Sequence, residues 1–109
     1  MYLIINNQEL RIRNANTFLK RLIGLLGEKE ILSGMLFPHT NSVHTFFMKT
    51  NIDILALDEN NEVILKWENV PKNKIFSVKN SVKKTSILEL PSNTSQNIKI
   101  GDKLSFIRK

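Results

Sequence analysis

The sequence predicts a mostly β fold, a small β-sandwich or barrel-like domain with one short α-helix in its N-terminal third. Three observations support this fold class. Short apolar or alternating segments are separated by turn residues roughly every 8–12 positions, which is typical of sandwiches and barrels. Only one segment has the apolar spacing of a helix. The 109 residues suffice for a single domain, residues 1–109, and are too few for two.

The N-terminal segment predicts a β-hairpin. Residues 2–5 are apolar, residues 9–13 alternate between polar and apolar side chains, and Asn6 and Asn7 lie between them. Asparagine tolerates the left-handed backbone conformation that a two-residue hairpin turn needs. We therefore expect two antiparallel strands joined at this turn.

Residues 16–27 are expected to form the helix. Asn16 or Thr17 can cap the free N–H groups of the first turn, and Gly27 suits the left-handed position after the last turn. One face of this helix is apolar, because four side chains recur at helical spacing: Phe18, Leu22, Leu25 and Leu26.

The rest of the chain predicts short strands. A turn at residues 59–62 joins two of them into a hairpin, in which Val63, Leu65 and Trp67 are expected to share one face. The expected strands are residues 35–37, 43–49, 52–58, 63–67, 75–78, 85–90 and 103–107.

Residues 43–58 are the most apolar segment, yet they contain Lys49 and Asp53. Both faces of the second strand in this segment are mainly apolar, which indicates a central strand that is covered on both sides. Asp53 is then buried, and it needs partners because an unpaired interior charge costs several kcal/mol. Alternation sorts the side chains into two faces: Asp53, Leu55 and Leu57 on one, and Ile52, Ile54 and Ala56 on the other.

The two charged residues allow a structural and a functional interpretation. In the structural one, Asp53 accepts hydrogen bonds from the backbone of the Thr50-Asn51 corner, or it pairs with Lys49 or Arg21. In the functional one, the corner binds a ligand: Lys49 is a positively charged donor and Asp53 orients it. Phe47 then supplies apolar contact. The predicted ligand-binding residues are Phe47, Lys49, Asp53 and Arg21.

We expect a non-enzymatic module that binds a small molecule or a protein near residues 46–53. Phe46, Phe47 and Met48 are core residues if both faces are covered; if one face is open, the exposed rings and Lys49 form a groove for an apolar or peptide ligand. An alternative is a small enzyme in which Lys49 and Asp53 transfer protons, since a desolvated lysine can act as a base or nucleophile. The sequence identifies no catalytic residue and no substrate.

The charge distribution is uneven. The net charge is +6, and residues 70–88 contain five lysines and no acidic residue. This segment has one aromatic residue, Phe76, and no arginine, so it lacks the stacking and base-reading side chains of nucleic-acid interfaces. We therefore expect a solvated surface and no nucleic-acid partner; the alternative is a nucleic-acid binder that uses this stretch. The lysines are Lys72, Lys74, Lys79, Lys83 and Lys84.

Several kinds of chemistry are excluded or not expected. The chain has no cysteine, which excludes disulfides, zinc–thiolate sites, iron–sulfur clusters and thiol catalysis. His39 and His44 match no metal-binding spacing, so no metal ion and no cofactor are expected. Asp53 and Glu89 are a candidate carboxylate pair for glycoside chemistry. The N-terminal apolar run is too short for a signal peptide or a membrane span, so a soluble, cytoplasmic protein of open oligomeric state is expected.

Short motifs between about residues 15 and 106 resemble the domain of unknown function 192 family, a widespread and uncharacterised prokaryotic family. The resemblance lies in the order and spacing of the motifs, and it implies a compact β-sandwich or barrel-like domain with a short helix and no known activity. The motifs are Thr17…Arg21…Gly24-Leu-Leu26, Gly34-Met-Leu-Phe37, Phe46-Phe-Met-Lys49, Ile52-Asp-Ile54 with Asp58, Leu88-Glu-Leu-Pro91 and Gly101-Asp102.

The resemblance also marks positions of interest and departures. Relatives often have Met at the position of Leu26, Trp at Phe47, Asn at Thr50 and Gly where Ser92-Asn93 stands. Many relatives carry an export or lipoprotein signal, and none is apparent here, so a cell-envelope role is not expected. The polar or special residues of the pattern are Arg21, Met48, Lys49, Asp53, Asp58 and Glu89.

Overall fold

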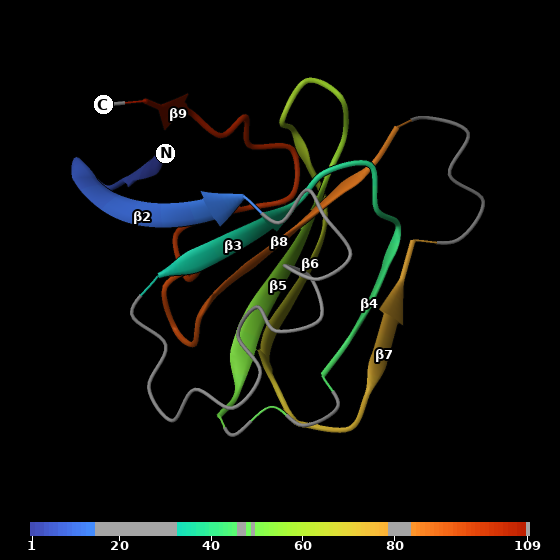
Figure 1. Cartoon of the computed structure of the whole chain (residues 1–109). Helices are drawn as coiled ribbons and strands as arrows, with labels where there is room; N and C mark the ends of the chain where they lie inside the picture. The colour runs from blue at the N-terminus through green and yellow to red at the C-terminus, as the bar shows by residue number, and fades with distance from the viewer. Residues whose placement is uncertain (15–32, 46–47, 49, 79–83, 109) are drawn as a thin grey trace.

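The computed structural model describes residues 1–14, 33–45, 48, 50–78 and 84–108 of the chain (Figure 1). These residues form nine strands and no helix, which confirms a mostly β fold. The helix expected at residues 16–27 lies outside the described residues. Within them, no helix is long and apolar enough to cross a membrane.

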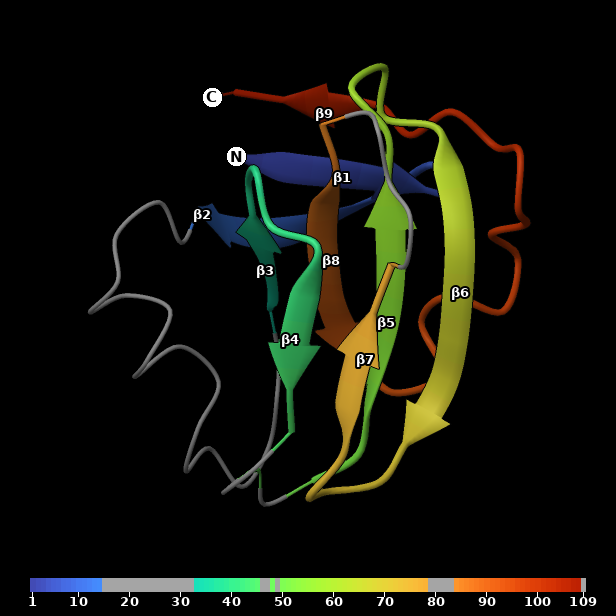
Figure 2. The same ribbon diagram turned by 90° about the vertical axis from the view of Figure 1, so that its right-hand side faces the viewer.

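The strands belong to a seven-stranded sheet, in the order β6-β5-β8-β3-β2-β1-β9, and to a separate two-stranded sheet of β4 and β7. Figure 2 shows β4 and β7 as a layer in front of β5, β6 and β8. The strands are β1 (Tyr2–Ile5), β2 (Gln8–Asn14), β3 (Gly34–Phe37), β4 (Ser42–His44), β5 (Ile52–Leu57), β6 (Val63–Val70), β7 (Ile75–Ser77), β8 (Ser86–Pro91) and β9 (Phe106–Ile107).

The hairpin predicted at the N-terminus is confirmed. Strands β1 and β2 pair antiparallel from Tyr2↔Arg11 to Ile5↔Gln8. Asn6 and Asn7 form the turn with φ angles of 51° and 63°. This left-handed pair matches the twist of the two strands, which is why adjacent asparagines stabilise such a turn.

The second half of β2 pairs parallel to β3, which is joined to β8 on its other side. Gly34 begins β3, and a Cβ atom at this position would lie 2.6 Å from Ile12 Cδ1 and 2.9 Å from the carbonyl oxygen of Glu89. Real Cβ atoms do not approach backbone this closely. The glycine therefore lets β2, β3 and β8 pack together.

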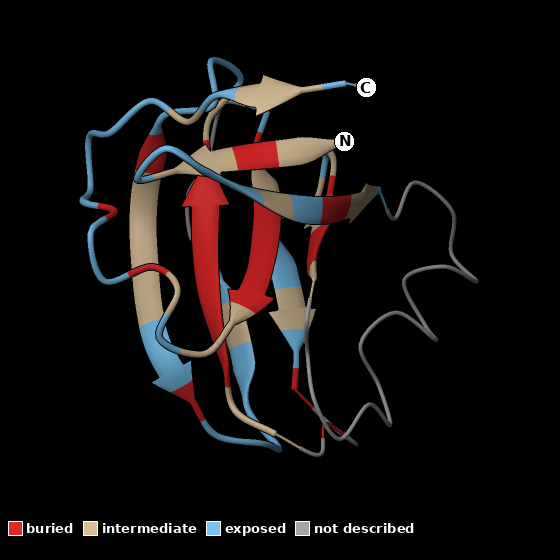
Figure 3. Ribbon diagram, turned by 90° about the vertical axis from the view of Figure 1, so that its left-hand side faces the viewer, coloured by how far each residue is buried: buried red, intermediate tan, exposed pale blue. Residues whose placement is uncertain are grey.

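The predicted central strand is confirmed as β5, which lies between β6 and β8 and has all six residues buried. One face of the seven-stranded sheet, here called the β4–β7 face, carries Ile52, Ile54 and Ala56 together with Ile87 and Met48. On the opposite face, here called the β1–β2 face, Leu55 and Leu57 pack with residues of β1, β2 and β8. Figure 3 shows β1 and β2 crossing in front of the buried strands β5 and β8.

The prediction that Val63, Leu65 and Trp67 share a face is wrong. Val63 packs in the core of the β1–β2 face, whereas Leu65 and Trp67 pack against the β4–β7 face. The cause is a bulge: Leu57 pairs with Val63, but its neighbour Ala56 pairs with Leu65. The extra residue on β6 reverses the alternation from that point onward.

The strand expected at residues 43–49 ends early, at His44. The next residue, Thr45, is buried and ties down the loop that leads into β7. Its Oγ1 donates to the Pro71 carbonyl at 2.8 Å and accepts from the Lys74 N–H at 2.9 Å. They add to two backbone bonds at this position, from the Thr45 N–H to Lys74 O at 2.8 Å and from the Asn73 N–H to Thr45 O at 3.1 Å.

The chain between Gly101 and Ser105 links the two ends of the large sheet. Its backbone bonds to the start of β6, with Val63 N–H donating to Asp102 O at 2.8 Å and Leu104 N–H donating to Asn61 O at 2.9 Å. On the other side, Ile4 N–H of β1 donates to Ser105 O at 3.1 Å. Backbone hydrogen bonds therefore join β6 to β1 in two ways: through the neighbouring strands of the sheet, and through the segment between Gly101 and Ser105.

Candidate functional site

Of the four predicted ligand-binding residues, Asp53 lies in the described part of the chain. Phe47, Lys49 and Arg21 lie outside the described residues, and their role stays a prediction. Asp53 is the second residue of β5, and its side chain is buried on the β1–β2 face. Met48, from the same corner, packs in the core of the β4–β7 face.

The carboxylate of Asp53 receives three hydrogen bonds. Its Oδ1 accepts from the Asn69 N–H at 2.8 Å, and its Oδ2 accepts from the Ser95 N–H at 3.1 Å and the Ser95 hydroxyl at 2.6 Å. Asn69 belongs to a second bulge, since Ile52 pairs with Val70 while Ile54 pairs with Trp67. A bulged residue loses its ladder partner, and Asp53 supplies one.

Asp53 therefore joins three segments that are distant in sequence: β5, the bulge of β6 and the turn that follows β8. The partners expected at the Thr50-Asn51 corner are replaced by groups 16 and 42 positions away. Both carboxylate oxygens are occupied by these bonds. The arrangement gives Asp53 a structural function at the point where β5 begins.

Glu89 is the second buried acid, in the middle of β8. Paired strands hold register partners on the same face of a sheet, so Glu89 shares the β4–β7 face with its partners Met35 of β3 and Ile54 of β5. Met35 in turn pairs with Arg13, and Ile54 with Trp67. A row of five side chains thus crosses the face: Arg13, Met35, Glu89, Ile54 and Trp67.

The two described neighbours of Glu89 in this row, Met35 and Ile54, are apolar. Glu89 is 4% exposed, and no hydrogen bond or ion pair joins its carboxyl group to another residue of the described ranges. Burial removes the water that would solvate the charged form, and this raises the pKa of Glu89 from 4.5 to about 8. At pH 7 the group is therefore mainly a neutral acid, which can donate one hydrogen bond and accept others.

The carboxylate pair considered for glycoside chemistry is not formed. Asp53 pairs in register with Leu90, the residue after Glu89. Because neighbouring residues of a strand point to opposite faces, the two acids lie on opposite sides of the sheet. They cannot act on the same bond.

Arg13 and Trp67 flank the buried acid at the two ends of the row. Arg13 lies two strands from Glu89, or about 10 Å between backbones at the usual strand spacing. Trp67 contacts Phe76 of β7, with ring centroids 5.4 Å apart and an angle of 59° between the rings. One face of the sheet thus combines a cation, a neutral acid and an aromatic pair.

From the sequence, Glu89 stands out only as a position of the family pattern and as half of the candidate carboxylate pair with Asp53. The local signal was available, because Glu89 interrupts the apolar run Ile87-Leu-Glu-Leu90 just as Asp53 interrupts its own strand. The sequence does not show which of the two acids has partners. That difference depends on what the fold brings to each face.

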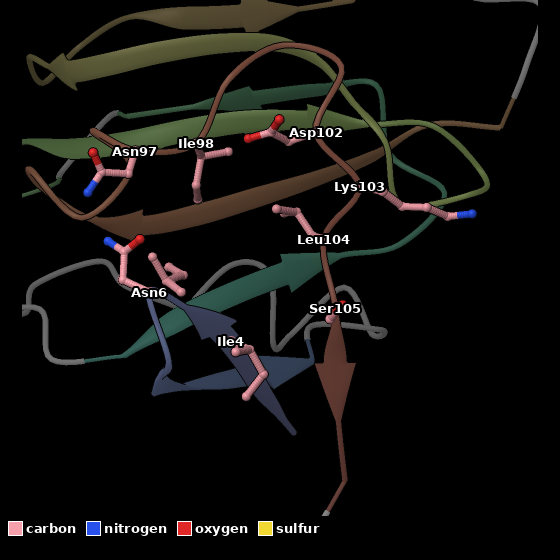
Figure 4. A pocket seen from close by; sticks show the side chains of 9 residues that line it. Ile4, Asn6, Asn97, Ile98, Asp102, Lys103, Leu104 and Ser105 are labelled. Carbon is pink, nitrogen blue, oxygen red and sulfur yellow. The ribbon is translucent and has the colours of Figure 1, made fainter.

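A pocket of about 280 Å³ lies elsewhere, between the β1–β2 turn and the chain segment that follows β8 (Figure 4). It is lined by Ile4, Ile5, Asn6, Asn97, Ile98, Asp102, Lys103, Leu104 and Ser105.

The lysines of the basic stretch that the structure describes lie at the surface. Lys72, Lys74 and Lys84 are exposed, while Lys79 and Lys83 lie outside the described residues. No group of three or more histidine or acidic residues that could hold a metal ion occurs within the described part of the chain.

Comparisons with known proteins agree with this fold. A protein of unknown function from Novosphingobium aromaticivorans has a similar structure, with a TM-score of 0.78 and 18% identity over 96% of this chain and 82% of the other. A protein from Sinorhizobium meliloti, described as a candidate transcription regulator, has a TM-score of 0.78 and 19% identity over 95% of this chain and 89% of the other. At these identities the likeness concerns the fold alone.

No curated protein matches the sequence. The model of the family DUF192, described as uncharacterized ACR, matches residues 1–106. The chain therefore belongs to the domain of unknown function 192 family.

Proposed function

We propose that this chain is a barrel-like, non-enzymatic binding module whose ligand site lies on the β4–β7 face, near the corner of residues 46–53. The observation that carries the proposal is Glu89, a buried acid without a hydrogen-bond partner among the described residues. An unpaired polar group in an apolar interior costs about 1–3 kcal/mol. A ligand that forms the missing bonds offsets that cost when it binds.

The chemistry of the face favours a ligand with both neutral polar and apolar parts. Neutral Glu89 offers one donor and an acceptor, and Met35 and Ile54 offer apolar contact on either side. We propose that Phe47 adds a ring contact, and that Lys49 and Arg21 bind polar or negatively charged groups of the ligand. Asp53 contributes by holding the start of β5 in place.

A binding function is favoured over proton transfer by Lys49 and Asp53. Three hydrogen bonds already occupy both oxygens of Asp53. A general base needs a free oxygen near the proton that it removes, so Asp53 is poorly arranged for that task.

The test is a search for a retained ligand. Protein purified without an affinity tag is measured by native mass spectrometry and crystallised, and we expect a bound molecule in contact with Glu89. The variant Glu89→Leu keeps the approximate volume of the side chain and removes its polar group. Its native mass spectrum should lack the additional mass of the bound molecule. Glu89→Gln should keep it, because the amide still donates and accepts.

Two controls complete the design. The exposed turn residue Glu59 is replaced in the matched control Glu59→Gln, which should retain the ligand like the wild type. Variants Phe47→Ala and Lys49→Met test the remaining predicted contacts. A wild-type protein without any retained mass or density on this face, or a mass that Glu89→Leu retains unchanged, would contradict the proposal.

A further inference from the structure

We propose that the pocket between the β1–β2 turn and residues 97–105 is a second binding site, which takes one aliphatic residue of a peptide together with its adjoining peptide group. This site lies apart from the β4–β7 face and goes beyond the function proposed above. Its floor is aliphatic, its rim contains two amide side chains, and both walls are held by hydrogen bonds.

The pocket exists because two segments that pair along part of their length then separate. Strands β1 and β9 pair at Tyr2↔Ile107 and Leu3↔Phe106, and Ile4 N–H still donates to Ser105 O. The next residue, Leu104, bonds to Asn61 at the start of β6 instead. The end of β1 therefore has open space beside it, where side chains rather than backbone form the walls.

Both walls are rigid before any ligand binds. The first is the β1–β2 turn, whose two left-handed asparagines fix its shape. In the second, Lys66 Nζ donates to Ile98 O at 2.6 Å, and the Lys99 N–H donates to Asp102 Oδ2 at 2.9 Å. A preformed site loses little conformational entropy when a ligand enters.

The lining selects the class of ligand. Ile98 is 4% exposed and belongs to the core of the β1–β2 face, and with Ile5 and Leu104 it gives the pocket an aliphatic floor. Figure 4 shows Asn6 and Asn97 at the same end of the pocket, and the ammonium group of Lys103 pointing away from it. The site thus presents two amides and the Asp102 carboxylate rather than a cation, which favours a neutral ligand over an anion.

The two amides match a peptide group. Neither Asn6 nor Asn97 forms a side-chain hydrogen bond with another residue of the described ranges, and both side chains are exposed. Each can donate two hydrogen bonds and accept two, so together they complement one peptide N–H and one C=O. The volume of about 280 Å³ is just below the range of about 300–1,000 Å³ usual for drug-sized ligands, so it suits a single residue.

The test is an NMR titration of the full chain with N-acetyl-leucine methylamide. We expect saturable shifts of the methyl signals of Ile5, Ile98 and Leu104 and of the side-chain amide signals of Asn6 and Asn97. N-acetyl-glycine methylamide has the same peptide groups without the aliphatic side chain. It should bind at least tenfold more weakly, because burying a leucine side chain contributes about 1.5–3 kcal/mol.

Variants separate this site from other effects. Asn97→Ala should weaken binding about threefold to tenfold, the usual contribution of a neutral hydrogen bond, while the exposed turn variant Asn60→Ala should bind like the wild type. Glu89→Gln should also bind N-acetyl-leucine methylamide like the wild type. The titration therefore tests this pocket independently of the ligand site proposed on the β4–β7 face. Equal binding of the glycine analogue, shifts located elsewhere, or no saturation up to tens of millimolar would overturn the proposal.

Discussion

Replacing Glu89 with glutamine should remove a large pH-dependent loss of stability. The pKa of Glu89 is about 8 in the folded protein and 4.5 without burial. Between these values the folded state keeps the proton and the unfolded state releases it, so the free energy of unfolding falls as pH rises. Glutamine is nearly the same size and stays neutral at every pH. Its burial therefore adds no pH dependence to the free energy of unfolding.

The size of the effect follows from the pKa difference. Each pH unit between the two values costs about 1.4 kcal/mol. At pH 7, about 2.5 units above 4.5, the burial of Glu89 therefore costs about 3 kcal/mol. The full interval to pH 8 gives about 5 kcal/mol as an upper bound. This is a large part of the 5–15 kcal/mol typical of a small domain.

Urea denaturation followed by circular dichroism measures the effect directly. Other groups also titrate, so the informative quantity is the free energy of unfolding of Glu89→Gln minus that of the wild type at each pH. It should rise in favour of the variant by about 2–3 kcal/mol between pH 5.5 and pH 7.5. The exposed control Glu59→Gln should differ from the wild type by a small, constant amount.

One result would refute the reasoning. If the difference between Glu89→Gln and the wild type stays constant across this interval, Glu89 has the same affinity for its proton in both states. The carboxyl group would then be solvated or paired in the folded protein, and the proposed ligand site would lose its main support.

Three further predictions follow from other contacts. Asp53→Ala should lower the free energy of unfolding by about 2–4 kcal/mol at pH 7, because it leaves the buried N–H of Ser95 unpaired; an unchanged urea midpoint would contradict this. Gly34→Ala should lower the melting temperature by several degrees, since overpacking costs about 1–3 kcal/mol, and equal melting of the two proteins would show that β3 can shift. Gel-shift experiments with DNA and RNA at low salt should show no binding, although Lys72 and Lys74 are exposed; a complex that weakens steeply with salt would favour the nucleic-acid alternative.

Local features of the fold were predictable where neighbouring residues decide them. The Asn6-Asn7 turn depends on two adjacent residues that tolerate left-handed backbone, and the hairpin follows from it. The two faces of β5 were predicted correctly because no bulge lies within that strand's alternation, as the packing of Ile54 and Leu55 in opposite cores shows. The same argument failed for β6, where one extra residue reversed the pattern after Val63.

The candidate site was predictable only in part. Asp53 was correctly expected to be buried with partners, because an apolar strand on both sides leaves a carboxylate no water. Its partners Asn69 and Ser95 could not be named, since a bulge and a distant turn provide them. Glu89 lies in a strand whose sequence is as apolar as that around Asp53. The sequence therefore does not show that Asp53 accepts hydrogen bonds while the Glu89 carboxyl group has no partner among the described residues.

By itself, the sequence determined the family, the mostly β composition and the central, doubly covered strand, because motif order and side-chain alternation are properties of the chain. Only the tertiary structure decided that Asp53 and Glu89 occupy opposite faces of the sheet. It also decided that Asp53 accepts three hydrogen bonds, whereas Glu89 has no donor among the described residues. The pocket between β1 and residues 97–105 is likewise a product of the tertiary structure. The physical reason is that hydrogen-bond partners and desolvation depend on which distant strands meet, and strand pairing is settled by the whole fold rather than by neighbouring residues.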